Sequence, residues 1–282
     1  MSLPTKVYQR ENNHNLFKLL KESLVDIVGS FFLAKQLATR DIKAKYRQSY
    51  FGILWAFITP LTTGLVWIFL NSSGTVAISD TGMPYPIFVF TGTILWSIII
   101  EAINSPMATT RGARGIMSKI NFPKEALLVS GILKLIFNSS IKILVLVGFL
   151  LFFGVSPQWS MLLFPIILLC GVFFGTVLGL FITPIGMLYN DVASIISLGL
   201  RLVMFAAPVV YAIPKEPGMF REVMRWNPFT PILTTARDTI LGADFTMLPY
   251  FLIVIAVCIP LFMIGLVFYR VSIPIIVERL SA

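Results

Sequence analysis

Six apolar stretches alternate with short polar segments along most of the chain. Each stretch has about the 20 residues that an α-helix needs to cross the hydrocarbon core of a bilayer. They lie near residues 51–71, 86–105, 128–153, 161–188, 192–212 and 247–269. We therefore predict an all-α integral membrane protein with about six transmembrane helices, which form one transmembrane domain over residues 51–270.

The segment before the first apolar stretch has a different pattern. Apolar side chains recur every four residues in 31–50, at Ala34, Ala38, Ile42 and Tyr46. Five basic residues are spread over the remaining positions: Lys35, Arg40, Lys43, Lys45 and Arg47. This pattern predicts an N-terminal amphipathic helix in the membrane interface. The alternative is an ordinary charged flank before a span. Residues 1–30 are polar, lack the apolar core of a signal peptide, and are expected to form a cytoplasmic N-terminal segment.

Residues 213–246 are too apolar for a plain linker. The sequence WNPFTPILTTARDTILG within them contains two prolines followed by a helix-like stretch. We predict an extracytoplasmic re-entrant helix pair here, because irregular backbone survives at membrane depth only where protein or water covers it. The residues that mark this re-entrant segment are Asn227, Pro228, Pro231, Arg237 and Asp238.

Composition agrees with a membrane protein and charge gives its orientation. Hydrophobic residues make up 57% of the chain, charged residues 12%, and the mean hydropathy is +0.87. Residues 1–50 contain nine lysines and arginines, and residues 106–127 contain four. Arg270 and the tail 271–282 together contain two, whereas residues 71–85 and 154–160 contain none. Because basic loops stay on the cytoplasmic side, both termini are expected there. This rule also accounts for the net charge of +9 without nucleic acid.

Few residues offer catalytic or metal chemistry. His14 stands alone in the polar N-terminal segment, and Cys170 and Cys258 lie in apolar stretches without metal-ligand spacing. The Gly-rich sequence RGARGIMSK has the wrong spacing for a phosphate-binding loop. We therefore expect no enzyme activity, cofactor or metal in this chain, and no ATP bound by the chain itself.

Charged side chains inside the spans are more informative. Ser130, Lys134, Asn138 and Lys142 form one polar stripe on the third span. A lysine near the bilayer centre costs roughly 3 kcal/mol, so two on one face indicate a wet or anionic neighbour. The stripe is either a pathway wall or phosphate contact, or a pair of lysines that extend towards the membrane surface.

Three other residues bear on this stripe. Glu101 and Arg201 could pair with each other or with the stripe, and the sequence leaves this open. Trp55 and Arg201 complete the candidate channel lining, although most aromatic residues fit an interfacial belt.

Four segments resemble the membrane subunits of ABC transporters that export polysaccharides. Residues 37–61 resemble the family's basic helix and first span, with Gly52, Trp55 and Pro60 at its marked positions. Three further matches follow in the family's order, at residues 119–133, 189–211 and 226–242.

The resemblance implies a homodimeric channel in the bacterial inner membrane. The chain would be a transport subunit, and two separate ATPase subunits that bind ATP and Mg²⁺ would dock on its cytoplasmic face. The cargo would be a lipid-diphosphate-linked polysaccharide such as O antigen, capsule or teichoic acid. Residues 112–125 would form a coupling helix and residues 31–48 a lever beside the gate. The implied coupling residues are Arg111, Arg114, Lys119, Phe122, Pro123, Lys124 and Glu125. The interface-helix residues are Arg40, Asp41, Lys43, Tyr46 and Arg47.

Two other classes of function stay in competition. A related ABC exporter of drugs or small lipophilic molecules would need the same ATPase but fewer sugar-stacking aromatic rings. A self-sufficient membrane glycosyltransferase would need paired carboxylates. A proton-coupled carrier would need buried acids in several spans. Glu101, Asp191 and Asp80 are isolated in the sequence, which disfavours both.

Overall fold

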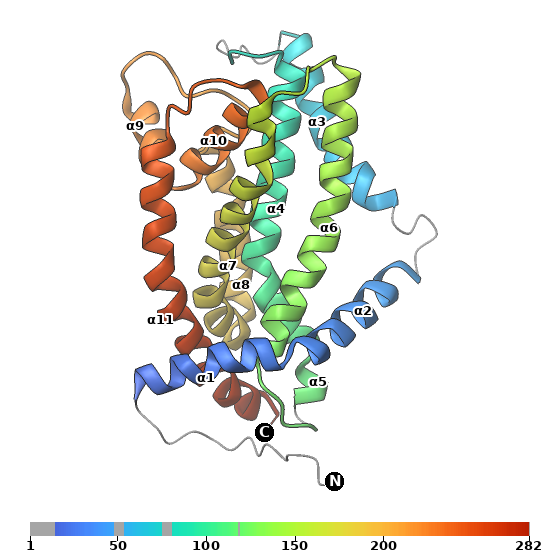
Figure 1. The fold of residues 1–282 in the computed structure, drawn as a ribbon, viewed down its shortest axis with the longest axis vertical. Helices are drawn as coiled ribbons and strands as arrows, with labels where there is room; N and C mark the ends of the chain where they lie inside the picture. Colours follow the sequence, from blue (N-terminus) through green and yellow to red (C-terminus); the bar gives the residue numbers. More distant parts are fainter. Residues whose placement is uncertain (1–14, 48–53, 75–80, 118, 282) are drawn as a thin grey trace.

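The computed structural model describes residues 15–47, 54–74, 81–117 and 119–281, and within them every regular element is a helix (Figure 1). Gly52 and the side chain of Pro60 lie outside the described part. Four described helical segments are long and apolar enough to cross a membrane. They are α4 (Tyr85–Gly112), α6 (Glu125–Phe152), α7 (Phe164–Leu188) with the preceding 3₁₀ turn η2 (Trp159–Leu163), and α11 (Leu248–Ser281). The prediction of an all-α membrane protein is confirmed.

The other two predicted spans correspond to shorter helices. These are α3 (Trp55–Ser72) and α8 (Asn190–Phe205). With 16 residues, α8 is about 24 Å long and ends before the predicted boundary at residue 212. Pro208 lacks a backbone N–H, and Arg237 binds the carbonyls of residues 208 and 209. The backbone there is therefore held outside the helix.

The centre of the bundle is α4, which packs against α3, α6, α7 and α10. Its tightest contact is with α7, where glycines recur every four residues. A Cβ atom on Gly179 would lie 2.4 Å from the carbonyl oxygen of Ile103, and one on Gly175 would lie 2.8 Å from that of Ile99. Small residues at this spacing let two membrane helices approach closely. These glycines therefore hold α7 closely against α4, the helix that carries Glu101.

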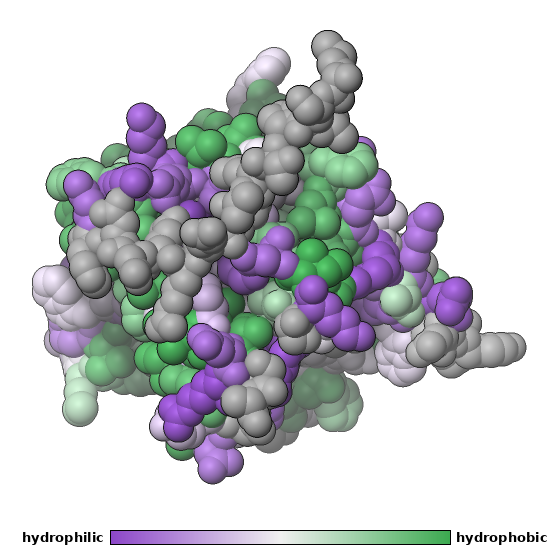
Figure 2. Space-filling view, turned by 90° about the horizontal axis from the view of Figure 1, so that it is seen from below, coloured by the Kyte–Doolittle hydropathy of each residue, from purple (hydrophilic) through white to green (hydrophobic). Residues whose placement is uncertain are grey.

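Two helices cross one end of the bundle, which we call the α1 end. These helices, α1 (Leu16–Gly29) and α2 (Phe31–Arg47), lie across the long helices, near α5 (Arg114–Met117) and the C-terminal end of α11 (Figure 1). Viewed from this end, hydrophilic residues are spread over the surface with hydrophobic patches between them (Figure 2). The expected amphipathic helix is thus present as α2.

The sequence analysis did not predict α1. Asn15 caps it, because the side-chain oxygen of Asn15 accepts hydrogen bonds from the backbone N–H groups of Phe17 and Lys18. Leu16, Phe17, Leu24 and Val28 are exposed on an apolar face. The cap and the apolar spacing were readable signals of this helix.

The opposite end of the bundle, which we call the α10 end, carries the predicted helix pair. It consists of α9 (Met219–Trp226) and α10 (Phe229–Leu241), and α10 packs against η2, α7 and α11. Asn227 joins them: its amide donates to the carbonyl of Ala206 at 2.8 Å and its oxygen accepts from the N–H of Phe229 at 3.0 Å. Gly242, with φ of 66°, ends α10 in the left-handed conformation.

The expected coupling helix over residues 112–125 is wrong as a single element. Gly112 is the last residue of α4 and Glu125 the first of α6. Among the residues described between them, Arg114–Met117 is helical and residues 119–123 have no regular structure. Pro123 contributes to this break, because a proline disfavours the helical conformation in the residue before it. The segment is therefore a short turn followed by a surface loop.

Candidate functional site

The polar stripe on α6 faces carboxylates from two other helices. Lys134 Nζ lies 2.7 Å from Asp41 Oδ2 on α2, and Lys142 Nζ lies 2.7 Å from Glu101 Oε2 on α4. The anionic neighbours inferred from the sequence are therefore Asp41 and Glu101. Glu101 pairs with the stripe and not with Arg201.

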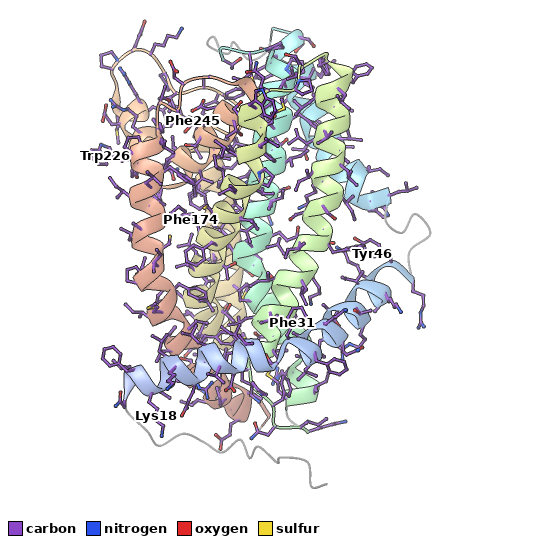
Figure 3. All side chains as sticks on the ribbon, in the orientation of Figure 1. Lys18, Phe31, Tyr46, Phe174, Trp226 and Phe245 are labelled. Atoms are coloured by element: carbon purple, nitrogen blue, oxygen red, sulfur yellow. The ribbon has the colours of Figure 1, made fainter. Side chains whose placement is uncertain are left out.

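Asn138 lies between the two lysines on α6 and extends the Lys142–Glu101 pair to α2. Its amide nitrogen donates to Glu101 Oε1, and its oxygen accepts from the hydroxyl of Tyr46 at 3.2 Å. Tyr46 lies on the side of α2 towards α6 (Figure 3). We call this set the polar column: Asp41, Tyr46, Glu101, Lys134, Asn138 and Lys142.

The polar column ties α2 to the bundle. The apolar face of α2 packs on α6, with Ala34, Leu37 and Ala38 buried. Burial raises the pKa of Asp41, but the hydrogen bonds and charges of Lys134 and Arg40 outweigh it, so the net pKa lies below its usual value. Asp41 therefore stays ionised and keeps its attraction for Lys134.

The remaining interface-helix residues face away from this contact. Arg40 pairs with Asp41 at 2.7 Å and is half-exposed, whereas Lys43 and Arg47 lie on the open surface of α2. The helix thus presents basic side chains outward while its acidic residue binds inward. That arrangement allows α2 to contact an anionic surface and α6 together.

The other candidate lining residues have different surroundings. Ser130 is buried in the packed interior, and its hydroxyl has no hydrogen-bond partner among the described residues. Trp55, at the start of α3, and Arg201, on α8, are both exposed. The structure therefore separates Ser130 and Arg201 from the polar column.

A second charged cluster joins α1, α6 and α11, and the sequence analysis missed it. Arg270 lies 2.9 Å from Asp26, 2.7 Å from Glu125 and 3.6 Å from Glu22. Ser23 also donates to Glu125 at 2.9 Å. These residues are far apart in the chain, so no local spacing could have revealed the cluster.

The expected coupling residues divide into a buried and an exposed group. Phe122 and Glu125 are buried, and Arg111 donates to the carbonyl of Gly186 at 3.0 Å, which ties α4 to α7. Arg114, Lys119 and Ile120 are exposed. The open surface of the loop is therefore basic with one large apolar side chain.

The end of this loop is packed against the bundle. Pro123 is partly buried, and Lys124 Nζ lies 4.7 Å from the centre of the Phe122 ring. Burial lowers the pKa of Lys124, and the neighbouring charge of Glu125 opposes that shift. Phe122 and Lys124 thus connect the exposed loop to the start of α6.

Arg237 organises the α10 end. Its guanidinium is buried, donates to the carbonyls of Pro208, Val209 and Phe88, and stacks 3.6 Å from the centre of the Phe88 ring. Carbonyl acceptors and an aromatic face stand here in place of a carboxylate. Arg237 joins α10, the turn after α8 and α4 into one unit.

Other marked residues of the helix pair shape the start and end of α10. Pro228 precedes its first turn and Pro231 is buried in that turn, where a proline loses no helical hydrogen bond. Asp238 is partly buried and one of its oxygens has no hydrogen-bond partner among the described residues. Burial raises the pKa of Asp238 to about 6, against a backbone hydrogen bond from Thr246 and the charge of Arg237.

The fold is a helical bundle with crossing helices at one end and a helix pair at the other (Figure 1). Residues 33–241 match the ABC-2 type transporter family. The chain therefore belongs to the ABC-2 type transporters, and it is a multi-pass membrane permease.

Particular relatives narrow this class. The chain is 26% identical over 201 residues to the O-antigen export system permease protein RfbA of Myxococcus xanthus, which is 71% of this chain and 76% of the relative. It is 24% identical over 210 residues to a protein of the same name from Klebsiella pneumoniae, covering 74% and 80%.

Proposed function

We propose that this chain is the channel-forming permease of an ATP-driven exporter of lipid-linked polysaccharide, with O antigen as the leading candidate. The observation that carries this proposal is the similarity to O-antigen export permeases over about three quarters of both chains. The chain would act in the bacterial inner membrane as a homodimer with two cytoplasmic ATPase subunits.

The α1 end is the proposed cytoplasmic face. It gathers the basic helix α2, the loop with Arg114 and Lys119, and the end of α11 (Figure 1). Basic segments are retained on the cytoplasmic side of a membrane, so both termini would lie there. The α10 end, with its paired helices, would then face outward.

The exposed loop after α5 is the proposed ATPase contact. Lys119 and Ile120 point into solvent, while Phe122 and Glu125 are packed against the bundle. A push on this loop would reach α6 directly and α1 and α11 through the bond between Glu125 and Arg270. The polar column would carry the same movement from α6 to α2.

Deletion of the gene tests the proposal. We expect loss of surface polysaccharide, accumulation of its lipid-linked form inside the cell, and restoration by the intact gene. The tagged protein should co-purify with an ABC ATPase. Normal surface polysaccharide together with increased sensitivity to lipophilic drugs would instead support a drug exporter.

A further inference from the structure

Arg201 is a cation on the open face of α8. The exposed residues on this side of the helix are Asp191, Ser194, Ile195, Leu198, Arg201, Leu202 and Phe205, at spacings of three and four. Beside Arg201 this face is apolar, with Leu198, Leu202 and Phe205 exposed. A charged side chain therefore projects from a surface that otherwise suits lipid or an apolar channel wall.

We infer the depth of Arg201 from its distance along α8, with the turn between α7 and α8 placed at the proposed cytoplasmic boundary. It is eleven residues from Asn190, the first residue of α8, or about 16 Å along the helix. That distance is about half of a typical hydrocarbon thickness of roughly 30 Å. Leaving a bare cation at this depth is costly, so an anion or water must accompany it.

Three other cations of the long helices have their anions within the chain. Lys134 binds Asp41, Lys142 binds Glu101, and Arg270 binds Asp26 and Glu125. Arg201 forms no hydrogen bond or ion pair with any residue that the structure describes. The two lysines first considered for an anionic ligand are thus neutralised, and Arg201 is available.

In the proposed homodimer, the acid exposed on α8 of the second copy would lie far from Arg201. Two copies related by an axis along the membrane normal place equal residues at equal depth. The acidic residue exposed on the same face of α8 is Asp191, about 15 Å away along the helix axis. Glu101 is already bound to Lys142. Neither acid is placed to pair with Arg201, which favours an anion from another molecule.

We propose that Arg201 binds the phosphate of a lipid-linked substrate as its head group crosses the middle of the membrane. Guanidinium suits this task because its planar donors match phosphate oxygens in pairs and it is weakly hydrated. The same chemistry is present in bilayer phospholipids, so the test must separate the two sources. This inference rests on the proposed export of lipid-linked polysaccharide.

The test measures binding of a radiolabelled polyprenyl diphosphate to the purified permease–ATPase complex in phosphatidylcholine nanodiscs. We expect Arg201→Gln to raise the half-saturating concentration about tenfold or more, and Arg201→Lys about threefold because it keeps the charge but loses the fork. Arg225→Gln removes an exposed arginine from α9 and should change it by less than about twofold.

A second set of nanodiscs contains equal parts phosphatidylcholine and phosphatidylglycerol. We expect the difference between the wild type and Arg201→Gln to persist there. Loss of that difference would assign Arg201 to bilayer phospholipid and overturn the proposal. Equal binding by the wild type and both Arg201 variants, or no binding by the wild type, would also overturn it.

Two controls keep the result interpretable. The unfolding temperature of each variant and its co-purification with the ATPase must match those of the wild type. If Arg201→Gln fails to assemble, the half-saturating concentration of Arg201→Lys decides the test. Failure of the proposed function would show as normal surface polysaccharide in the deletion strain. Failure of this inference would leave export dependent on the gene while binding ignored Arg201.

Discussion

Arg270 on α11 lies 2.7 Å from Glu125, the first residue of α6; Glu125 is buried and Arg270 is partly buried. The same guanidinium reaches Asp26 on α1, so one cation holds three helices together. Without Arg270, the buried carboxylates of Asp26 on α1 and Glu125 on α6 would lie near each other without this positive charge between them. The loop proposed to contact the ATPase ends at this cluster.

Replacement of Arg270 by glutamine should strongly destabilise the protein. It leaves Asp26 and Glu125 buried without their cation, and breaking such a pair costs about 3 kcal/mol or more. Thermal unfolding in detergent, followed by fluorescence, measures the loss. Arg279→Gln, an exposed change on the same helix, should leave the unfolding temperature within error. Equal stability of both variants would contradict the role of Arg270.

Removing the opposite charge tests the same cluster from the other side. The double variant Arg270→Gln with Glu125→Gln should recover part of the stability lost in Arg270→Gln alone, because a neutral amide replaces the orphaned carboxylate. Additive losses would show that the two groups act independently.

The close approach of α7 to α4 predicts opposite effects for two glycines. Gly179→Ala should destabilise by about 1–3 kcal/mol, since its Cβ would meet the carbonyl oxygen of Ile103 at 2.4 Å. Gly148 on α6 has no atom within 4 Å of its added Cβ, so Gly148→Ala should be neutral or stabilising. Unfolding curves of both variants decide, and a harmless Gly179→Ala would refute the contact.

Variants of the polar column should lower export more than they lower folding stability. Asp41→Asn leaves Lys134 without its anion and loosens α2 from α6, so surface polysaccharide should fall. The charge-swapped pair Asp41→Lys with Lys134→Asp should restore export above either single variant. Lys43→Gln, on the open face of α2, is the matched control. Unchanged export in Asp41→Asn and Lys134→Ala would exclude this role for the pair.

Asp238 predicts a pH dependence of stability. Its folded-state pKa of about 6 exceeds its ordinary value of 3.8, so the folded protein binds the proton more tightly. The contribution of Asp238 is full below its ordinary pKa and is lost as pH rises through about 6. Asp238→Asn should flatten the change in unfolding temperature between about pH 4 and pH 7. An unchanged slope would assign the titration to other groups.

The exposed loop predicts a separable effect on assembly. Ile120→Glu adds a charge at an exposed apolar side chain and should reduce ATPase co-purification without lowering the unfolding temperature. Asn121→Glu, which adds the same charge at an exposed polar position of this loop, is the matched control. Full co-purification of Ile120→Glu would place the ATPase elsewhere.

The sequence by itself determined the class of protein. The preference of each apolar residue for lipid adds up along a stretch of about 20 residues, so α4, α6, α7 and α11 could be predicted from the sequence alone. The paired helices around Asn227 and the amphipathic helix α2 were also visible, because proline positions and four-residue spacing are local signals. The same local signals around Asn15 would have revealed α1.

Only the tertiary structure decided which charges meet. Asp41 and Lys134 are 93 residues apart, and Asp26 and Arg270 are 244 apart. No spacing rule relates such residues, because their distance depends on how the helices pack. Gly175 and Gly179 set that packing by letting α7 approach α4. The fold therefore neutralises Lys134 and Lys142 with neighbouring acids and leaves Arg201 without an anion from the described chain, a distinction that the sequence could not make.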